Sequence, residues 1–142
     1  MGSAQLRTAA PMGDWRSFKF IVTVSAGLIH GDLTLIQETV GSVFIGRPVL
    51  DVNGCTLPLV AAVGEECVLI YHAEKILVDK LTGSGEVFLP GDKVYWSGVT
   101  GTGVSPVYTS GWYWIGICVQ PADADVLTVV IDLKGDKATL LE

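Results

Sequence analysis

EECVLIYHAEKILVDKL, residues 65–81, is the stretch that decides the fold class, because it alone has a composition that would also suit a helix. It contains no glycine or proline and includes several good helix formers. However, the consecutive residues Val68 to Tyr71 would place apolar side chains all round a helix instead of along one stripe. Valine, isoleucine and tyrosine also favour strands. The pattern therefore favours a strand over a helix here.

From Phe18 onward the chain alternates between short strand-like runs and turn-forming residues. The runs are FKFIVTV (18–24), DLTLIQ (32–37), SVFIG (42–46), PVLDV (48–52), CTLPLVAA (55–62), ECVLIYHA (66–73), KILVDKL (75–81), DKVYWS (92–97), WYWIGICV (112–119) and VLTVVIDL (126–133). Between two of them, Asn53–Gly54 is a strong signal for a hairpin. We therefore predict an all-β fold, a compact β-barrel or β-sandwich of about eight to ten short strands with an extended N-terminal arm.

The first residues lack the periodicity of the rest. Residues 1–17 are mostly small and polar, so we expect an N-terminal arm over 1–17 and a β-domain over 18–142. Trp15 is the exception, because a large aromatic side chain is better docked onto a surface than left in water. We expect the arm to be mobile in the free protein and to order when it binds a partner.

Composition excludes several classes of protein. Of 142 residues, 49% are hydrophobic and 17% are charged, a balance opposite to that of a disordered chain. The net charge of −6, with nine basic residues scattered singly, disfavours nucleic acid and anionic membranes as partners. No apolar run is long enough for a membrane span, and the N-terminus lacks the layout of a signal peptide.

No cofactor or metal is expected. The three cysteines Cys55, Cys67 and Cys118 lie singly in apolar stretches, where a free thiol behaves as a small hydrophobe. There is no C-x-x-C pair to indicate zinc or redox chemistry. Asp123 and Asp125 resemble a fragment of a calcium loop, but the loop's glycine and closing glutamate are missing, which favours an acidic turn.

No pattern indicates catalysis. His30 lies beside a turn and His72 within a strand-like run, but no serine lies in a G-x-S-x-G elbow. The glycine-rich stretch Gly98–Val104 lacks the helix that follows a phosphate-binding loop. On an alternating strand Trp112 and Trp114 would share one face, which suits a core or interface better than stacking on a sugar. We therefore expect a protein that is not an enzyme.

The order of features along most of the chain nevertheless resembles a known family. The features are AGLIHGDLTLI (26–36), GSVFIG (41–46), VAAVGEECVLIYHAEKILVDKL (60–81), GDKVYW (91–96) and WIGICVQPADADVLTVVIDLKG (114–135). In this succession the chain resembles the phage capsid cement, or head-decoration, family, formerly a domain of unknown function found in prophages. The stretch Arg47–Val60 is longer than the family's usual connection, so an extra hairpin is expected there.

The resemblance implies a protein without catalytic residues that binds the outer surface of an assembled head and stabilises it. Its partners would be the major capsid protein and its own copies, as a homotrimer, and its location would be the virion after synthesis in the host cytoplasm. Gly91 and Asp92 would form a turn before a strand, with Tyr95 on one face and Trp96 on the other. We expect the capsid contact at Trp15, Arg16 and Phe18.

Two other functions remain open at this point. A β-barrel that binds carbohydrate or a receptor on the virion would expose Trp112 and Trp114 for ring stacking. A small hydrolase would use His30 or His72.

Overall fold

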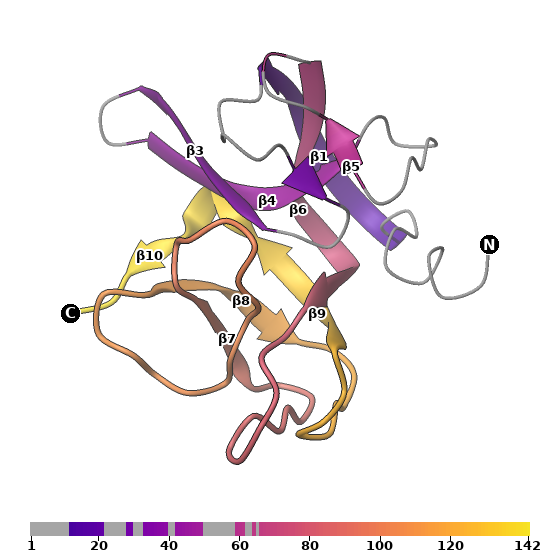
Figure 1. Ribbon diagram of the computed structural model, residues 1–142, viewed down its shortest axis with the longest axis vertical. Coiled ribbons are helices and arrows are strands. Elements are labelled where there is room, and N and C mark those ends of the chain that lie inside the picture. The colour runs from indigo at the N-terminus through magenta and orange to yellow at the C-terminus, as the bar shows by residue number, and fades with distance from the viewer. Residues whose placement is uncertain are drawn as a thin grey trace.

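The computed structural model describes residues 12–21, 28–29, 33–39, 42–49, 59–61, 64 and 66–142, and these residues form an all-β protein (Figure 1). The elements are β1 (Met12–Ile21), β2 (Leu28–Ile29), β3 (Thr34–Thr39), β4 (Ser42–Val49), β5 (Leu59–Ala61), β6 (Glu66–Asp79), β7 (Lys93–Trp96), β8 (Tyr113–Cys118), β9 (Thr128–Lys134), the 3₁₀ turn η1 (Gly135–Lys137) and β10 (Thr139–Leu140). The prediction of an all-β fold is confirmed. The strand predicted within residues 65–81 is β6.

Eight of these strands form one curled antiparallel sheet. Its order is β10-β8-β9-β6-β4-β3, with β1 added to β6 and β7 added to β8. Strands β2 and β5 form a separate antiparallel pair. In Figure 1, β1, β3, β4 and β5 lie in the upper half of the view, β7 and β8 lie below, and β6 runs between the two groups.

Strand β6 is long enough to join both halves of the sheet. Along one edge it pairs with β1, from Ile21 opposite Glu66 to Met12 opposite Lys75. Along the other edge it pairs first with β4 and then with β9. His72, for example, lies opposite residues of β1 and of β9 at once. The uninterrupted run of strand-favouring residues in β6 is what allows one strand to serve both pairings.

The change of partner along β6 requires a glycine in η1. Gly135 follows β9 directly and is buried between β4 and β6. A Cβ atom at this position would overlap the carbonyl oxygen of Ile45 in β4 and lie 2.7 Å from that of Tyr71 in β6. The backbone of η1 can therefore pass between the two strands only without a side chain.

The core lies on the inner face of the curled sheet. Its buried members come from the residue before β3, from β4, β6, β7, β8 and β9, and from the connections that follow β6, β7 and β8: Leu33, Ile45, Ile70, Ala73, Ile76, Val78, Phe88, Val94, Trp96, Val104, Ile115, Cys118, Ala122, Val129, Ile131 and Leu133. Strand β9 shows the pattern most simply, because its buried and half-buried residues alternate from Thr128 to Lys134.

The first strand begins earlier than the sequence analysis placed it. Strand β1 starts at Met12 and continues through Ser17 and Phe18, so the boundary drawn between arm and domain falls inside a strand. Residues 1–11 of the expected arm lie outside the described residues, as do Asn53–Gly54 and most of the hairpin expected within 47–60. Among the described residues, no helix has the length and apolar character needed to span a bilayer.

Candidate functional site

Two long connections lie side by side at the lower end of the molecule in Figure 1. One joins β6 to β7 (residues 80–92) and the other joins β8 to β9 (residues 119–127). Phe88 and Ala122 exchange both backbone hydrogen bonds, at 2.9 and 3.0 Å, as in an antiparallel ladder. The amide of Gly83 also donates to the carbonyl of Ala124 at 3.0 Å. The two connections therefore behave as a short β-ribbon and not as separate flexible loops.

Lys80, which directly follows β6, forms side-chain hydrogen bonds with the backbone of this ribbon. Its side chain is buried, and Nζ donates to the carbonyl oxygens of Leu81 at 2.7 Å, Asp123 at 3.0 Å and Val126 at 3.0 Å. Burial lowers the pKa of the Lys80 ammonium, and the negative charges of Glu86, Asp125 and Asp123 partly offset that effect. The acidic turn expected at 121–125 is thus folded around a lysine ammonium.

The turn predicted at Gly91 and Asp92 is present and closes the ribbon. The amide of Asp92 donates to the carbonyl of Leu89 at 3.0 Å, and Oδ2 of Asp92 accepts from the amide of Leu89 at 2.8 Å. Gly91 has φ of +94°, which the third position of a type II turn requires, and Pro90 precedes it. These bonds hold the backbone in the turn.

The strand that follows the turn is more deeply buried than predicted. Val94, Tyr95 and Trp96 are all buried, and the pairing register with β8 shifts between Val94 and Tyr95, so the three do not simply alternate between two faces. Trp96 Nε1 donates to the carbonyl of Thr102 at 2.9 Å, which satisfies the indole in the core. Tyr95 packs edge-on against Tyr108, with ring centroids 5.7 Å apart.

The residues expected to contact a capsid are only partly available. The Trp15 side chain is half-buried and packs against the core. The centroid of the Phe18 ring lies 5.2 Å from that of Phe44 and 5.6 Å from that of Tyr71. These two partner rings belong to β4 and β6, strands of the same sheet as β1. Arg16 is exposed. The two aromatic side chains proposed as anchors therefore stabilise this chain itself, which the short-range sequence pattern did not reveal.

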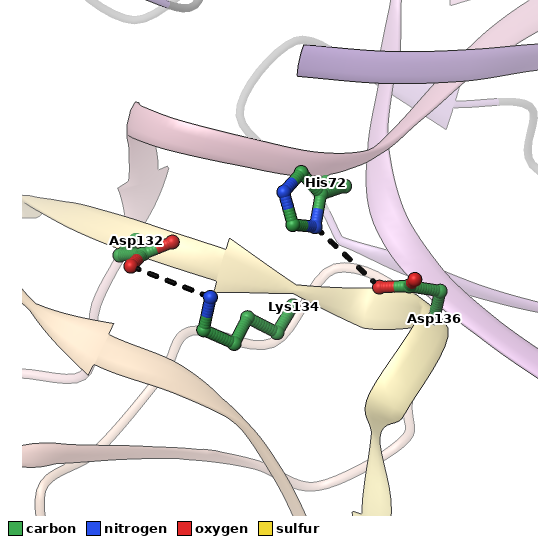
Figure 2. A network of polar contacts seen from close by, with 4 residues as sticks. All are labelled: His72, Asp132, Lys134 and Asp136. Atoms are coloured by element: carbon green, nitrogen blue, oxygen red, sulfur yellow. Dashed lines mark ion pairs between the residues drawn. The ribbon is translucent and has the colours of Figure 1, made fainter. Parts of the chain in front are cut away.

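The histidine considered for catalysis faces an aspartate (Figure 2). His72 Nδ1 lies 3.6 Å from Oδ1 of Asp136 in η1, and both side chains are about one-fifth exposed. Nearby on β9, Lys134 Nζ lies 3.6 Å from Oδ2 of Asp132. This arrangement links β6 to η1, which fits a structural role. His30 lies outside the described residues.

The two tryptophans, which the alternative of sugar stacking would require to be exposed, are not an exposed pair. Trp112 precedes β8, where its amide donates to Thr109 and its carbonyl accepts from Leu141 at 2.7 Å. Trp114 lies within β8, opposite Tyr95 and Thr139. Both tryptophans are half-buried.

Two of the three cysteines are described, and both are reduced and buried. Cys118 Sγ donates to the carbonyl of Gln120 at 2.9 Å, and burial raises the pKa of its thiol. Cys55 lies outside the described residues. Within the part of the chain that the structure describes, no group of three histidine, cysteine or acidic side chains is placed to hold a metal ion.

Large exposed apolar side chains gather in the connections around the core. In the described part of the chain these residues are Val87, Leu89, Val99, Val107, Tyr108, Val126, Leu127 and Leu140. All but Leu140 lie in the connections β6–β7, β7–β8 and β8–β9. A shallow cavity of about 280 Å³ lies between these connections, lined by Asp79, Lys80, Gly101, Gly103 and Leu127.

The surface formed by these three connections is the candidate functional site, because exposed apolar side chains held on a fixed backbone are typical of protein interfaces. The sequence predicts only turns in these connections, and Lys80 stands in it as one of several scattered basic residues. No family model matches the chain. No curated protein matches it.

Proposed function

We propose that the chain is a capsid decoration, or cement, protein that binds the outer surface of an assembled bacteriophage head and stabilises it. The observation that carries this proposal is the set of exposed apolar side chains on the β6–β7, β7–β8 and β8–β9 connections. The succession from GDKVYW (91–96) to WIGICV (114–119), which resembles the cement family, encloses one of these connections, β7–β8.

The physical argument starts from the cost of binding. A cement protein must gain enough free energy from a modest contact area to outweigh the loss of its translational and rotational freedom. Side chains on a backbone that is already fixed lose less entropy on binding than side chains on a flexible loop. The hydrogen bonds between Phe88 and Ala122 and the Lys80 contacts provide such fixation.

Composition supports the same reading. The chain combines a mean hydropathy of +0.48 with only 17% charged residues, which suits a protein that covers surface on its own copies and on shell subunits. Its net charge of −6 suits a position outside the shell, away from the packaged genome. The proposed partners are the major capsid protein and two further copies of this chain, with no catalytic step and no cofactor.

The direct test is co-sedimentation with heads. Purified chain is mixed with heads assembled from the major capsid protein encoded in the same genome, without any other decoration protein. We expect the chain to pellet with the heads to a saturating ratio and to raise the temperature at which the shells dissociate. A chain that remains in the supernatant at concentrations well above those of the shell subunits would overturn the proposal.

A further inference from the structure

The outer face of the ribbon at the lower end of the molecule is apolar. Phe88 and Ala122 face each other across the ribbon and are buried, so their neighbours in sequence point to the opposite face. Those neighbours are Val87 and Leu89, 44% and 59% exposed, on one strand, and Pro121 and Asp123, both exposed, on the other. Side chains opposite each other on one face of such a ladder lie about 5 Å apart. We call Val87, Leu89, Pro121 and Asp123 the ribbon face.

The charge within the two connections of the ribbon has one sign, and the next exposed base along the chain is Lys93, at the start of β7. Residues 81–92 and 119–127 contain four acidic residues, Glu86, Asp92, Asp123 and Asp125, and no lysine or arginine. The adjoining Lys80 is buried with its ammonium bound by carbonyl oxygens, so it presents little charge to a partner. Most other exposed bases of the described chain lie on β1, β6 and η1: Arg16, Lys75 and Lys137.

The aromatic residues of β1 are less suited than the ribbon face to contact a partner. Trp15 packs on the core and Phe18 packs on Phe44 and Tyr71, so releasing them to bind a partner would cost the contacts that they already make. Val87 and Leu89, by contrast, are exposed while their backbone is held in place. Binding through them costs no contact in the free protein.

We propose that the ribbon face is the surface that docks on the major capsid protein, at a site that presents an apolar depression bordered by lysine or arginine. The apolar side chains of Val87 and Leu89 supply buried area, and Asp123 with its acidic neighbours selects a basic border. This inference rests on the proposed function and adds to it the part of the chain that touches the shell and the charge of the shell's receiving surface.

The first experiment compares two substitutions of exposed apolar residues in the head-binding assay. Leu89→Ser removes the most exposed apolar side chain of the ribbon face, and Leu140→Ser removes a 56% exposed leucine from β10, outside the three connections, as a matched control. We expect Leu89→Ser to raise the dissociation constant for heads roughly tenfold or more, because burying a leucine side chain contributes on that scale. Leu140→Ser should change it less than about threefold.

The second experiment tests the charge and does not alter the apolar side chains. Wild-type binding should weaken as NaCl is raised, and the variant Asp123→Asn/Asp125→Asn should bind more weakly with a flatter salt dependence. The Asp123 carbonyl that accepts from Lys80 is backbone and is retained in this variant. Circular dichroism and the melting temperature establish that each variant is folded, and the two experiments alter different side chains.

The outcomes separate the two proposals. If wild-type protein pellets with heads while Leu89→Ser and the double asparagine variant bind as wild type does, the ribbon face is not the contact and the decoration function stands. If wild-type protein does not pellet, the decoration function fails and the ribbon inference with it. If Leu89→Ser instead reduces the mass of the free protein, the ribbon face joins copies of this chain, which also overturns the inference.

Discussion

Lys80 shows at the scale of one residue how this protein holds its long connections. A buried lysine is costly unless its ammonium is well solvated by the protein, and here three backbone carbonyls from residues 81, 123 and 126 do this at 2.7 to 3.0 Å. The same bonds satisfy carbonyl groups that would otherwise need water. The side chain therefore acts as an internal ligand for the β8–β9 connection.

Replacing Lys80 with methionine should destabilise the protein. The variant keeps the aliphatic stem but removes the Lys80 donor from the carbonyls of Asp123 and Val126, and the Asp123 carbonyl keeps only the weaker bond from the Val126 amide at 3.2 Å among the described contacts. Such a loss costs about 1–3 kcal/mol in the free energy of unfolding, measured by urea denaturation. Lys134→Met is the control, because the Lys134–Asp132 pair is about one-third exposed and contributes less than about 1 kcal/mol. Equal losses in the two variants would contradict the role given to Lys80.

Cys118 should react slowly in the folded protein. Burial raises the pKa of its thiol above the usual value of 9.0, so the folded chain keeps its proton at a pH where the unfolded chain has lost it. Stability from this group is accordingly complete below the unfolded pKa and is lost as the pH rises through the folded one. In a Cys55→Ala/Cys67→Ala variant, iodoacetamide at pH 8 should alkylate Cys118 more slowly in buffer than in urea, because the buried thiol is both less ionised and less accessible in the folded protein. Similar rates would show that the thiol is accessible.

At the scale of elements, the architecture depends on β6 and on what passes beside it. β6 pairs with β4 over one part of its edge and with β9 over the next, and η1 fills the space where β4 and β9 part. The His72–Asp136 contact lies at the same place (Figure 2). A small increase in side-chain volume in η1 would therefore disturb β4, β6 and β9 together.

Gly135→Ala should be among the most damaging small substitutions in the chain. The added Cβ would overlap the carbonyl of Ile45 and lie close to the carbonyl oxygen of Tyr71. Both groups belong to the backbone and cannot rotate away. We expect a loss of more than about 3 kcal/mol, beyond the usual range for overpacking. Gly85→Ala is the control, because Gly85 has φ of +88° but open space around it, and its cost should stay near 1 kcal/mol. Comparable melting temperatures for the two variants would rule out the steric argument.

Truncation should distinguish the arm from β1. A chain that starts at Met12 keeps all of β1, whereas one that starts at Phe18 loses Trp15 from the core and the pairing of Met12 to Ser17 with β6. Loss of a packed tryptophan alone costs about 3–5 kcal/mol. Thermal unfolding should therefore show a large drop for the second chain relative to the first. A second chain as stable as the first would mean that β1 contributes little before Phe18.

At the scale of the whole molecule, the wide distribution of exposed apolar side chains predicts self-association. Exposed apolar side chains occur on three connections and on β10, which is more than one partner surface needs. We propose a homotrimer, because a single contact repeated around a closed threefold axis buries such surface without leaving an open end.

Light scattering of the free protein at high concentration should give three times the mass of one chain. On decorated heads, the same assembly should be visible as threefold density. If the ribbon face is reserved for the shell, Leu89→Ser should leave that mass unchanged. Monomer mass in solution together with no threefold density on decorated heads would contradict the trimer.

The sequence alone determined the local features of this protein. The strand character of residues 65–81, the turn at Leu89–Asp92 and the all-β class follow from side-chain shape and backbone preference, which act over a few residues. Only the tertiary structure decided how Lys80 is used, because two of its carbonyl partners, Asp123 and Val126, lie more than 40 positions along the chain. For the same reason the sequence did not show that Phe18 would pack on Phe44 and Tyr71, or that Leu89 would remain exposed beside a buried Phe88. Burial and pairing between distant segments depend on the register of the whole sheet, which no short stretch of sequence specifies.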